Sequence, residues 1–147
     1  MKFRQYKFKF YLNISHAIYI NGTQGQSHPH TWEIAINALK LEDSFDQFNR
    51  LEEKIEGYLN RYQDQWINKV PPFDTLNPTL ENCCEFLKTE LRDLLRREGY
   101  QLLMIEMSET PTRSYIINLL DENDSSQVQS MSSFVDSKLE EIMNMSE

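Results

Sequence analysis

Two histidines stand one residue apart near the start of the segment QSHPHTWEIAINALKL, residues 26–41. The apolar residues that follow recur at every second position, which predicts a strand. Successive strand side chains leave opposite faces, so His28 and His30 share one face, with Cα atoms roughly 7 Å apart. Two imidazoles placed in this way can bind one metal ion. A chance pair of surface or hydrogen-bonded core histidines is the alternative that this short motif leaves open.

The only other histidine of the chain, His16, ends a second predicted strand. In KFRQYKFKFYLNISHA the aromatic and aliphatic side chains and His16 alternate with lysine and other more polar residues, which predicts one buried row. The segment between the two strands contains Asn21-Gly22, a pair that is typical of a tight hairpin turn. If the two strands pair antiparallel, their ends meet, and all three imidazoles lie at one rim of the sheet.

Three neutral imidazoles without a fourth protein ligand are the donor set of a catalytic zinc ion, which keeps one position open for water or substrate. A structural zinc ion would normally be closed by a fourth ligand, most often cysteine. The two cysteines, Cys83 and Cys84, are adjacent in a predicted helix far downstream and too close in sequence for an ordinary disulfide. We interpret both as small packed side chains.

Length and composition indicate one soluble domain. The chain has 147 residues, of which 39% are hydrophobic and 26% charged, and no apolar run approaches the ~20 residues that a membrane span requires. The formal net charge of −8 argues against a nucleic-acid partner, because phosphate binding needs a basic surface. The basic N-terminal residues alternate with aromatic ones, so no signal peptide is expected. We predict a cytoplasmic protein that binds neither nucleic acid nor membrane.

Two amphipathic helices are predicted in the middle of the chain. In the first, roughly residues 44–62, apolar residues step by three and four positions. The second begins after Asn77, a suitable N-cap, with Pro78 at the first helical position, and it ends at Gly99. Each helix therefore has one apolar face to bury.

Two strand-like runs follow, YQLLMIEMSET and RSYIINLL, separated by a Pro-Thr pair. In the first run the odd-numbered residues from Leu103 to Glu109 share one face, so a carboxylate ends an apolar row. The predicted order of elements is ββααββ. This order predicts an α+β fold in which two helices pack on one face of a four-stranded antiparallel sheet.

The C-terminal residues differ in composition from the rest. We assign residues 1–120 to the folded domain and residues 121–147 to an acidic polar tail. Within the tail, the apolar spacing of FVDSKLEEIMNMSE fits a short amphipathic helix as well as it fits a frayed, solvated end.

Four motifs in this order resemble the 6-pyruvoyl-tetrahydropterin synthase and 6-carboxytetrahydropterin synthase family, which has the tunnelling fold. They are ISHA, with His16; HPHTW, where the family has His-Gly-His followed by an aromatic residue; NPTLEN, where it has Pro-Thr-x-Glu-Asn; and IEMSET ahead of a tyrosine. Each motif alone is weak, but together they are fairly specific. The resemblance extends from about residue 3 to residue 120.

The resemblance implies a Zn²⁺ site made of His16, His28 and His30. It also implies that Glu109, with Thr110 beside it, anchors the pyrimidine edge of a pterin or purine-like ligand. A carboxylate suits this role because it can accept two parallel N–H bonds from a 2-amino-4-oxo ring. The family further implies a homo-oligomer, a trimer or a hexamer of stacked trimers, whose sheets close into a barrel with each site at a subunit boundary.

Three positions depart from the family pattern. Gln24 stands where the synthases have the cysteine that moves protons, and Gln63 and Asp64 stand where they have an Asp-His couple. Glutamine cannot act as a base. Asp64 is the remaining catalytic candidate, since a carboxylate near Zn²⁺ stays ionised and can accept a proton. General acid–base catalysis contributes about 10²–10⁴-fold, so a chain without it would be a feeble synthase.

Three hypotheses about function follow. The first is a zinc-dependent lyase or hydrolase of the pterin synthase type, with Zn²⁺ as Lewis acid. The second is a catalytically silent protein that retains zinc and a pterin or purine-like ligand as a structural or sensory element. The third is an oligomeric scaffold with an empty pocket, which the retained histidines argue against. We expect a divergent zinc-binding member of the family whose ordinary synthase reaction is in doubt.

Overall fold

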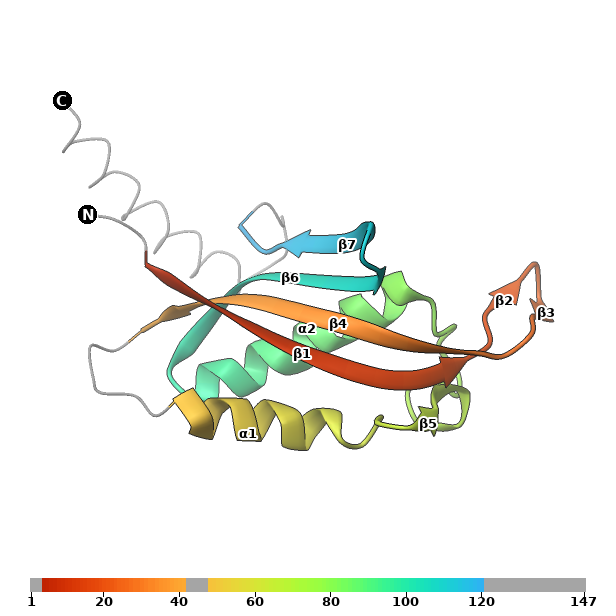
Figure 1. Cartoon of the computed structure of the whole chain (residues 1–147), viewed down its shortest axis with the longest axis horizontal. Coiled ribbons are helices and arrows are strands. Elements are labelled where there is room, and N and C mark those ends of the chain that lie inside the picture. The colour runs from red at the N-terminus through yellow and green to blue at the C-terminus, as the bar shows by residue number, and fades with distance from the viewer. Residues whose placement is uncertain (1–3, 42–47, 121–147) are drawn as a thin grey trace, which may run out of the picture.

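A sheet and two helices form the two layers of the domain, which the computed structural model describes for residues 4–41 and 48–120 (Figure 1). In chain order the elements are β1 (Gln5–His16), β2 (Tyr19–Ile20), β3 (Thr23–Gln24), β4 (His28–Lys40), α1 (Phe48–Leu59), β5 (Gln65–Trp66), a 3₁₀ helix (Ile67–Lys69), α2 (Leu80–Arg97), β6 (Tyr100–Thr110) and β7 (Arg113–Asn118). Helices α1 and α2 cover one face of the sheet, and their apolar residues share one core with it.

The pairing of β1 with β4 sets this core. The two strands run antiparallel, from Gln5 opposite Leu39 to His16 opposite His28. In β1 every even-numbered side chain from Phe8 to His16 is buried. The inward row of β4 consists of Trp32, Ile34, Ile36 and Ala38, each exposed by 1% or less. The alternation predicted for both strands is therefore confirmed.

The predicted four-stranded antiparallel sheet is wrong in one respect. The sheet has five strands, in the order β5-β1-β4-β6-β7, and it is mixed because β5 runs parallel to β1. A turn after α1 brings the chain back along the edge of β1, where Gln65 pairs with Ile14 and Trp66 with Ser15. A strand of two residues has no periodicity that a sequence pattern could reveal.

The hairpin between the histidine strands has the predicted turn. Asn21 and Gly22 both have positive φ, 52° and 79°, as the two central residues of a type I′ turn require. They join β2 to β3, which pair with each other and not with the main sheet. The hairpin extends beyond the end of β1, at the right of Figure 1.

Both helices differ at their ends from the prediction. Helix α1 ends at Leu59 and not at residue 62, and the predicted start at residue 44 lies outside the described residues. Helix α2 has Thr79 as its N-cap, because the Thr79 side chain accepts a hydrogen bond from the Asn82 backbone N–H at 3.1 Å. The predicted N-cap, Asn77, is wrong, since its side chain binds the backbone of another segment. The expected stop at Gly99, with φ of 87°, is confirmed.

A β-bulge changes the face assigned to one residue of β6. Ala38 pairs with Leu102 while its neighbour Asn37 pairs with Met104, so Leu103 is an extra residue between the two pairs. Leu102 therefore takes the inward, fully buried position that the sequence pattern assigned to Leu103. Beyond the bulge the alternation follows the prediction as far as the carboxylate near the end of the strand.

No helix in the described part of the chain combines the length and apolarity needed to span a membrane. The proposed tail, residues 121–147, lies outside the described residues.

Candidate metal centre

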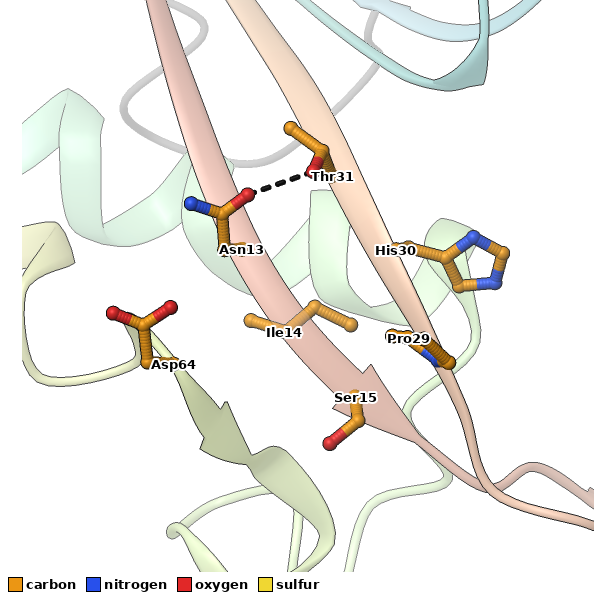
Figure 2. Close-up of a pocket in the computed structure, with 7 residues that line it drawn as sticks. All are labelled: Asn13, Ile14, Ser15, Pro29, His30, Thr31 and Asp64. Carbon is orange, nitrogen blue, oxygen red and sulfur yellow. Dashed lines mark hydrogen bonds between the residues drawn. The ribbon is translucent and has the colours of Figure 1, made fainter.

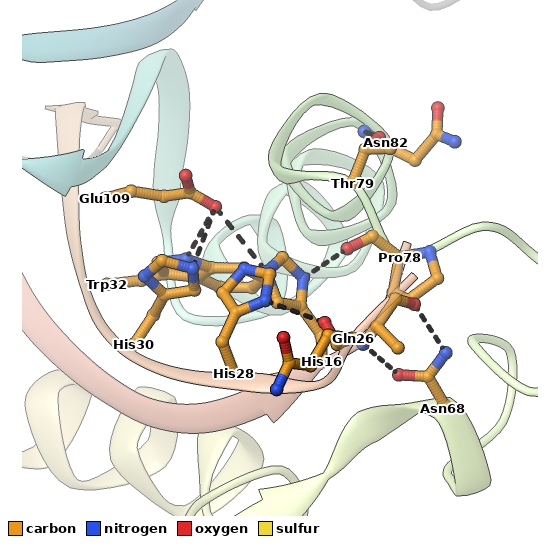
Figure 3. Close-up of polar contacts among 11 residues, drawn as sticks. His16, Gln26, His28, His30, Trp32, Asn68, Pro78, Thr79, Asn82 and Glu109 are labelled. Atoms are coloured by element: carbon orange, nitrogen blue, oxygen red, sulfur yellow. Dashed lines mark hydrogen bonds and ion pairs between the residues drawn. The ribbon is translucent and has the colours of Figure 1, made fainter. Parts of the chain in front are cut away.

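The three histidines of the chain meet at one end of the sheet (Figure 3). His16 is the last residue of β1, and the antiparallel register sets it directly opposite His28, the first residue of β4. His30 follows two residues later on the same face. One nitrogen from each ring lies within 4.8 Å of the other two. The prediction that three imidazoles converge at the rim is therefore confirmed.

Hydrogen bonds fix which nitrogen of two rings faces this centre. The Nδ1–H of His16 donates to the Pro78 carbonyl at 2.7 Å, and the Nδ1–H of His28 donates to the Gln26 carbonyl at 3.0 Å. Because a carbonyl can only accept, the neutral rings carry their lone pairs on Nε2. These backbone partners are the outer-shell contacts that metal-binding imidazoles use to set their tautomer.

The Nε2 atoms of His16 and His28 lie 3.2 Å apart. This is close to the ~3.3 Å that separates two nitrogen ligands in a tetrahedral zinc site. Two lone pairs facing each other at this distance repel, and a cation or a proton between them removes the repulsion. The geometry therefore fits a shared metal ion.

His30 adds a nitrogen that lacks a partner. Its Nε2 atom is buried and makes no hydrogen bond within the described structure. A buried polar atom without a partner is costly and uncommon in folded proteins. Metal coordination would satisfy it, so this orphaned atom is a second observation that the three rings fit a metal.

Burial lowers the pKa of His16, and the neighbouring rings of His30 and His28 act in the same direction. The hydrogen bond to the Pro78 carbonyl and the Glu109 carboxylate oppose this shift. The lowered pKa favours the neutral imidazole at pH 7, which is the form that binds a metal.

Glu109 lies beside the three rings at the end of β6. Its Oε1 accepts a hydrogen bond from the Trp32 indole N–H at 3.3 Å, and it lies 3.8 Å from His16 Nε2 and 3.9 Å from His30 Nε2 (Figure 3). The structure thus brings the predicted carboxylate to the predicted metal centre. Thr110, the next residue, is exposed, and its hydroxyl lies 3.2 Å from that of Thr112.

Comparison with known proteins identifies the family of the chain. The family model described as 6-pyruvoyl tetrahydropterin synthase matches residues 5–119. The chain belongs to the 6-pyruvoyl tetrahydropterin synthase family. No curated protein matches the chain.

Solved structures, including two synthases of this family, share the fold at low sequence identity. The 6-pyruvoyl tetrahydropterin synthase of Caenorhabditis elegans is 14% identical with a TM-score of 0.67, over 80% of this chain and 96% of that one. A Plasmodium vivax 6-pyruvoyltetrahydropterin synthase, in a variant with a catalytic Glu replaced by Ala, is 12% identical with a TM-score of 0.59, over 80% and 98%. An uncharacterized protein from Wolinella succinogenes is 13% identical with a TM-score of 0.61, over 83% and 100%. These values mark this chain as a divergent member of the family.

None of the three positions that depart from the family pattern belongs to the group of three histidines. Gln24 is exposed on β3. The Gln63 side chain accepts from the Asn13 N–H at 2.9 Å and donates to the Tyr11 carbonyl at 2.8 Å, so its amide pairs with the edge of β1 as a strand would. The group of potential metal ligands among the described residues contains the three histidines and not Asp64.

Asp64 lines an open pocket of about 470 Å³ on the other side of the strand pair (Figure 2). Its backbone N–H donates to the Asn13 carbonyl at 2.7 Å, and its φ is 59°. His30 also borders this pocket, but Figure 2 shows its ring directed away from Asp64. Asp64 therefore shares a pocket with His30 but does not belong to the group of three converging imidazoles.

Two asparagines hold the chain immediately after His16, a role that the sequence did not indicate for either of them. The Asn68 amide accepts from Ala17 N–H at 2.9 Å and donates to Ala17 C=O at 2.7 Å (Figure 3). The Asn77 amide makes the same two bonds with Tyr19, both at 2.9 Å. Each amide imitates a paired peptide group. Only the tertiary structure reveals this role, because both residues also look like ordinary turn formers.

The two cysteines are free and buried in α2. Burial raises the pKa of both thiols, that of Cys84 to about 12, so neither ionises readily to a metal-binding thiolate. The interpretation of these residues as packed side chains is confirmed.

Replacing Asn68 tests whether its amide stabilises the chain after His16 through its two hydrogen bonds to Ala17. Ala17 is only 1% exposed, so Asn68→Ala leaves its backbone N–H and C=O buried without their partners. We expect the free energy of unfolding, measured by urea denaturation, to fall by about 1–3 kcal/mol. The matched control is Asn60→Ala, which removes an exposed amide from the end of α1. Equal losses in the free energy of unfolding for the two substitutions would contradict this stabilising role of Asn68.

Proposed function

We propose that this protein is a divergent, zinc-binding member of the 6-pyruvoyl tetrahydropterin synthase family that binds a pterin or purine-like ligand at its three-histidine centre. The observation that carries the proposal is the arrangement of the three Nε2 atoms. Two of them face each other at 3.2 Å with their Nδ1 atoms bonded to carbonyls, and the third is buried without a partner. Zinc is the metal that this donor set suits best.

A bound Zn²⁺ would supply Lewis-acid chemistry by polarising a ligand oxygen. The residues of the chain have separate tasks around it. His16, His28 and His30 would hold the ion, and backbone carbonyls set the orientation of the first two rings. Trp32 holds the Glu109 carboxylate in place through its indole N–H, and this carboxylate would orient a 2-amino-4-oxo ring by accepting two N–H bonds. Thr110 would border the ring as its exposed neighbour.

The proton-transfer groups of the synthases are the part of the site that we propose has changed. Gln24 and Gln63 cannot accept a proton, and the Gln63 amide is already engaged with β1. The proposed base, Asp64, lies outside the three-histidine group but lines a pocket that His30 also borders. In a homo-oligomer, trimer or hexamer, with sites at subunit boundaries, it would act at the centre of a neighbouring copy.

A catalytically silent pterin-binding protein is the second candidate. It is favoured by the commitment of Gln63 to strand pairing, where the family has an acidic residue of the proton-transfer couple. Both candidates keep the metal and the ligand anchor. They differ only in whether bound substrate is converted.

The metal assignment predicts about one zinc ion per chain in the purified protein. His28→Ala removes one of three donors and should release the ion, because the remaining pair of imidazoles binds it far more weakly. Inductively coupled plasma mass spectrometry on dialysed samples measures the content. Cys83→Ala is the control and should keep its zinc. The site is ruled out if His28→Ala holds as much zinc as the unmodified protein.

The ligand assignment predicts that Glu109→Gln weakens binding of 7,8-dihydroneopterin by about 10–100-fold, because hydrogen bonds to a charged acceptor are lost. Calorimetric titration measures the affinity. Glu106→Gln lies on the same strand but borders a different pocket with Lys7 and Lys9, and it should bind normally. Unchanged affinity in Glu109→Gln would contradict the role of Glu109 as the ligand anchor.

The replaced proton-transfer residues predict that incubation with dihydroneopterin triphosphate, followed by product analysis, shows weak turnover or none. Robust turnover would contradict the proposal that Gln24 and Gln63 have removed the synthase reaction.

A further inference from the structure

We propose that Glu109 is a fourth ligand of the metal in the ligand-free protein, so that the centre is closed until a ligand draws the carboxylate away. This inference rests on the proposed metal site and adds to it. The sequence alone indicates three imidazoles and one open position. The structure adds a carboxylate oxygen near two of the three nitrogens, on β6, which supplies no histidine.

The position of the carboxylate is the first observation. Glu109 Oε1 lies 3.8 Å from His16 Nε2 and 3.9 Å from His30 Nε2. Ligand atoms of a four-coordinate zinc ion are ~3.3 Å apart, and carboxylate oxygen is an ordinary zinc ligand at about 2.0–2.2 Å. A small rotation of the Glu109 side chain would close the remaining gap of about 0.5 Å, since its terminal torsions are soft.

The electrostatics of the contact are the second observation. The Nδ1 atom of His16 donates to a carbonyl, so the neutral ring turns a lone pair, and not an N–H group, toward the Glu109 oxygen. His30 Nε2 is buried and donates to no acceptor. An anionic oxygen beside the His16 lone pair is unfavourable unless a cation lies between them, and such a cation would also give His30 Nε2 a partner.

The partners of Glu109 are the third observation. Within residues 4–41 and 48–120, the basic side chains within 4.0 Å of its carboxylate are the imidazoles of His16 and His30, and it accepts a hydrogen bond from Trp32. A partly buried carboxylate normally has a strong cationic partner. A metal ion held by the same two histidines would provide one.

This arrangement has a consequence for ligand selection. The same carboxylate cannot remain on the metal and also accept two N–H bonds from a heterocycle. A ring with adjacent N–H donors would therefore open the coordination position as it binds, whereas a small anion that offers no donors would find the position occupied. The metal would be protected from such anions until the correct class of ligand arrives.

Cobalt substitution tests the inference without relying on turnover. The protein is loaded with Co²⁺ in place of zinc, azide is added, and the visible absorption of the metal is recorded. We expect no spectral change in the unmodified protein or in Glu106→Gln, the matched control. In Glu109→Gln the position is open to solvent, and azide should shift the spectrum. Loss of cobalt from Glu109→Gln, with cobalt retained in Glu106→Gln, would equally support a ligand role.

Two results would overturn the inference. One is an azide-dependent shift in the unmodified protein, because its metal would then have an open position. The other is a Glu109→Gln protein that binds cobalt normally and ignores azide. Both results leave the three-histidine site standing. If the unmodified protein binds no cobalt at all, the metal site itself fails, and the proposed function fails with it.

Discussion

The antiparallel register between β1 and β4 is the constraint on which the rest of this structure depends. It sets His16 opposite His28 and Ile14 opposite His30 while burying the apolar rows of both strands against the helices. Because side chains alternate, a slip of one residue would turn an entire row of one strand to the outer face. Such a slip would expose the core and separate the imidazoles together. Burial of the core therefore also specifies the geometry of the metal centre.

The segment between α1 and α2 adds a second set of contacts to the sheet and to the histidines. Residues 63–79 run along the end of the sheet and bind it with side-chain amides, from Gln63, Asn68 and Asn77, in place of a regular strand. The same segment supplies the Pro78 carbonyl that fixes the His16 tautomer, and Thr79 then starts α2. The helix layer and the three-histidine centre are thus connected by one continuous stretch of chain.

The sequence predicts those features that depend on local periodicity. Alternation assigned the three histidines to one face, Asn21-Gly22 indicated the turn between them, and helical spacing located the apolar faces of α1 and α2. The predicted start of α2 was wrong because a tertiary contact competes with the local preference of one residue. Asn77 is a good N-cap by residue type, but its amide binds Tyr19, so Thr79 caps the helix instead.

Other features have no sequence signal at all. A β-bulge at Leu103 depends on how two strands meet, and the two-residue strand β5 depends on where a turn returns the chain. The orphaned nitrogen of His30 and the approach of Glu109 to the centre became visible only when side chains from three strands were placed together. These contacts are the ones on which the proposed metal coordination rests.

The amide of Gln63 also limits how this sheet can grow. From Tyr11 to Ser15 the outer edge of β1 is occupied, first by the Gln63 amide and the Asp64 backbone and then by β5. A strand from another polypeptide that adds to this edge must therefore stop before Tyr11 and run along the N-terminal half only. The Gln63 side chain thus limits how far an added strand can pair along β1, and it keeps an incoming backbone away from the histidine end of the sheet.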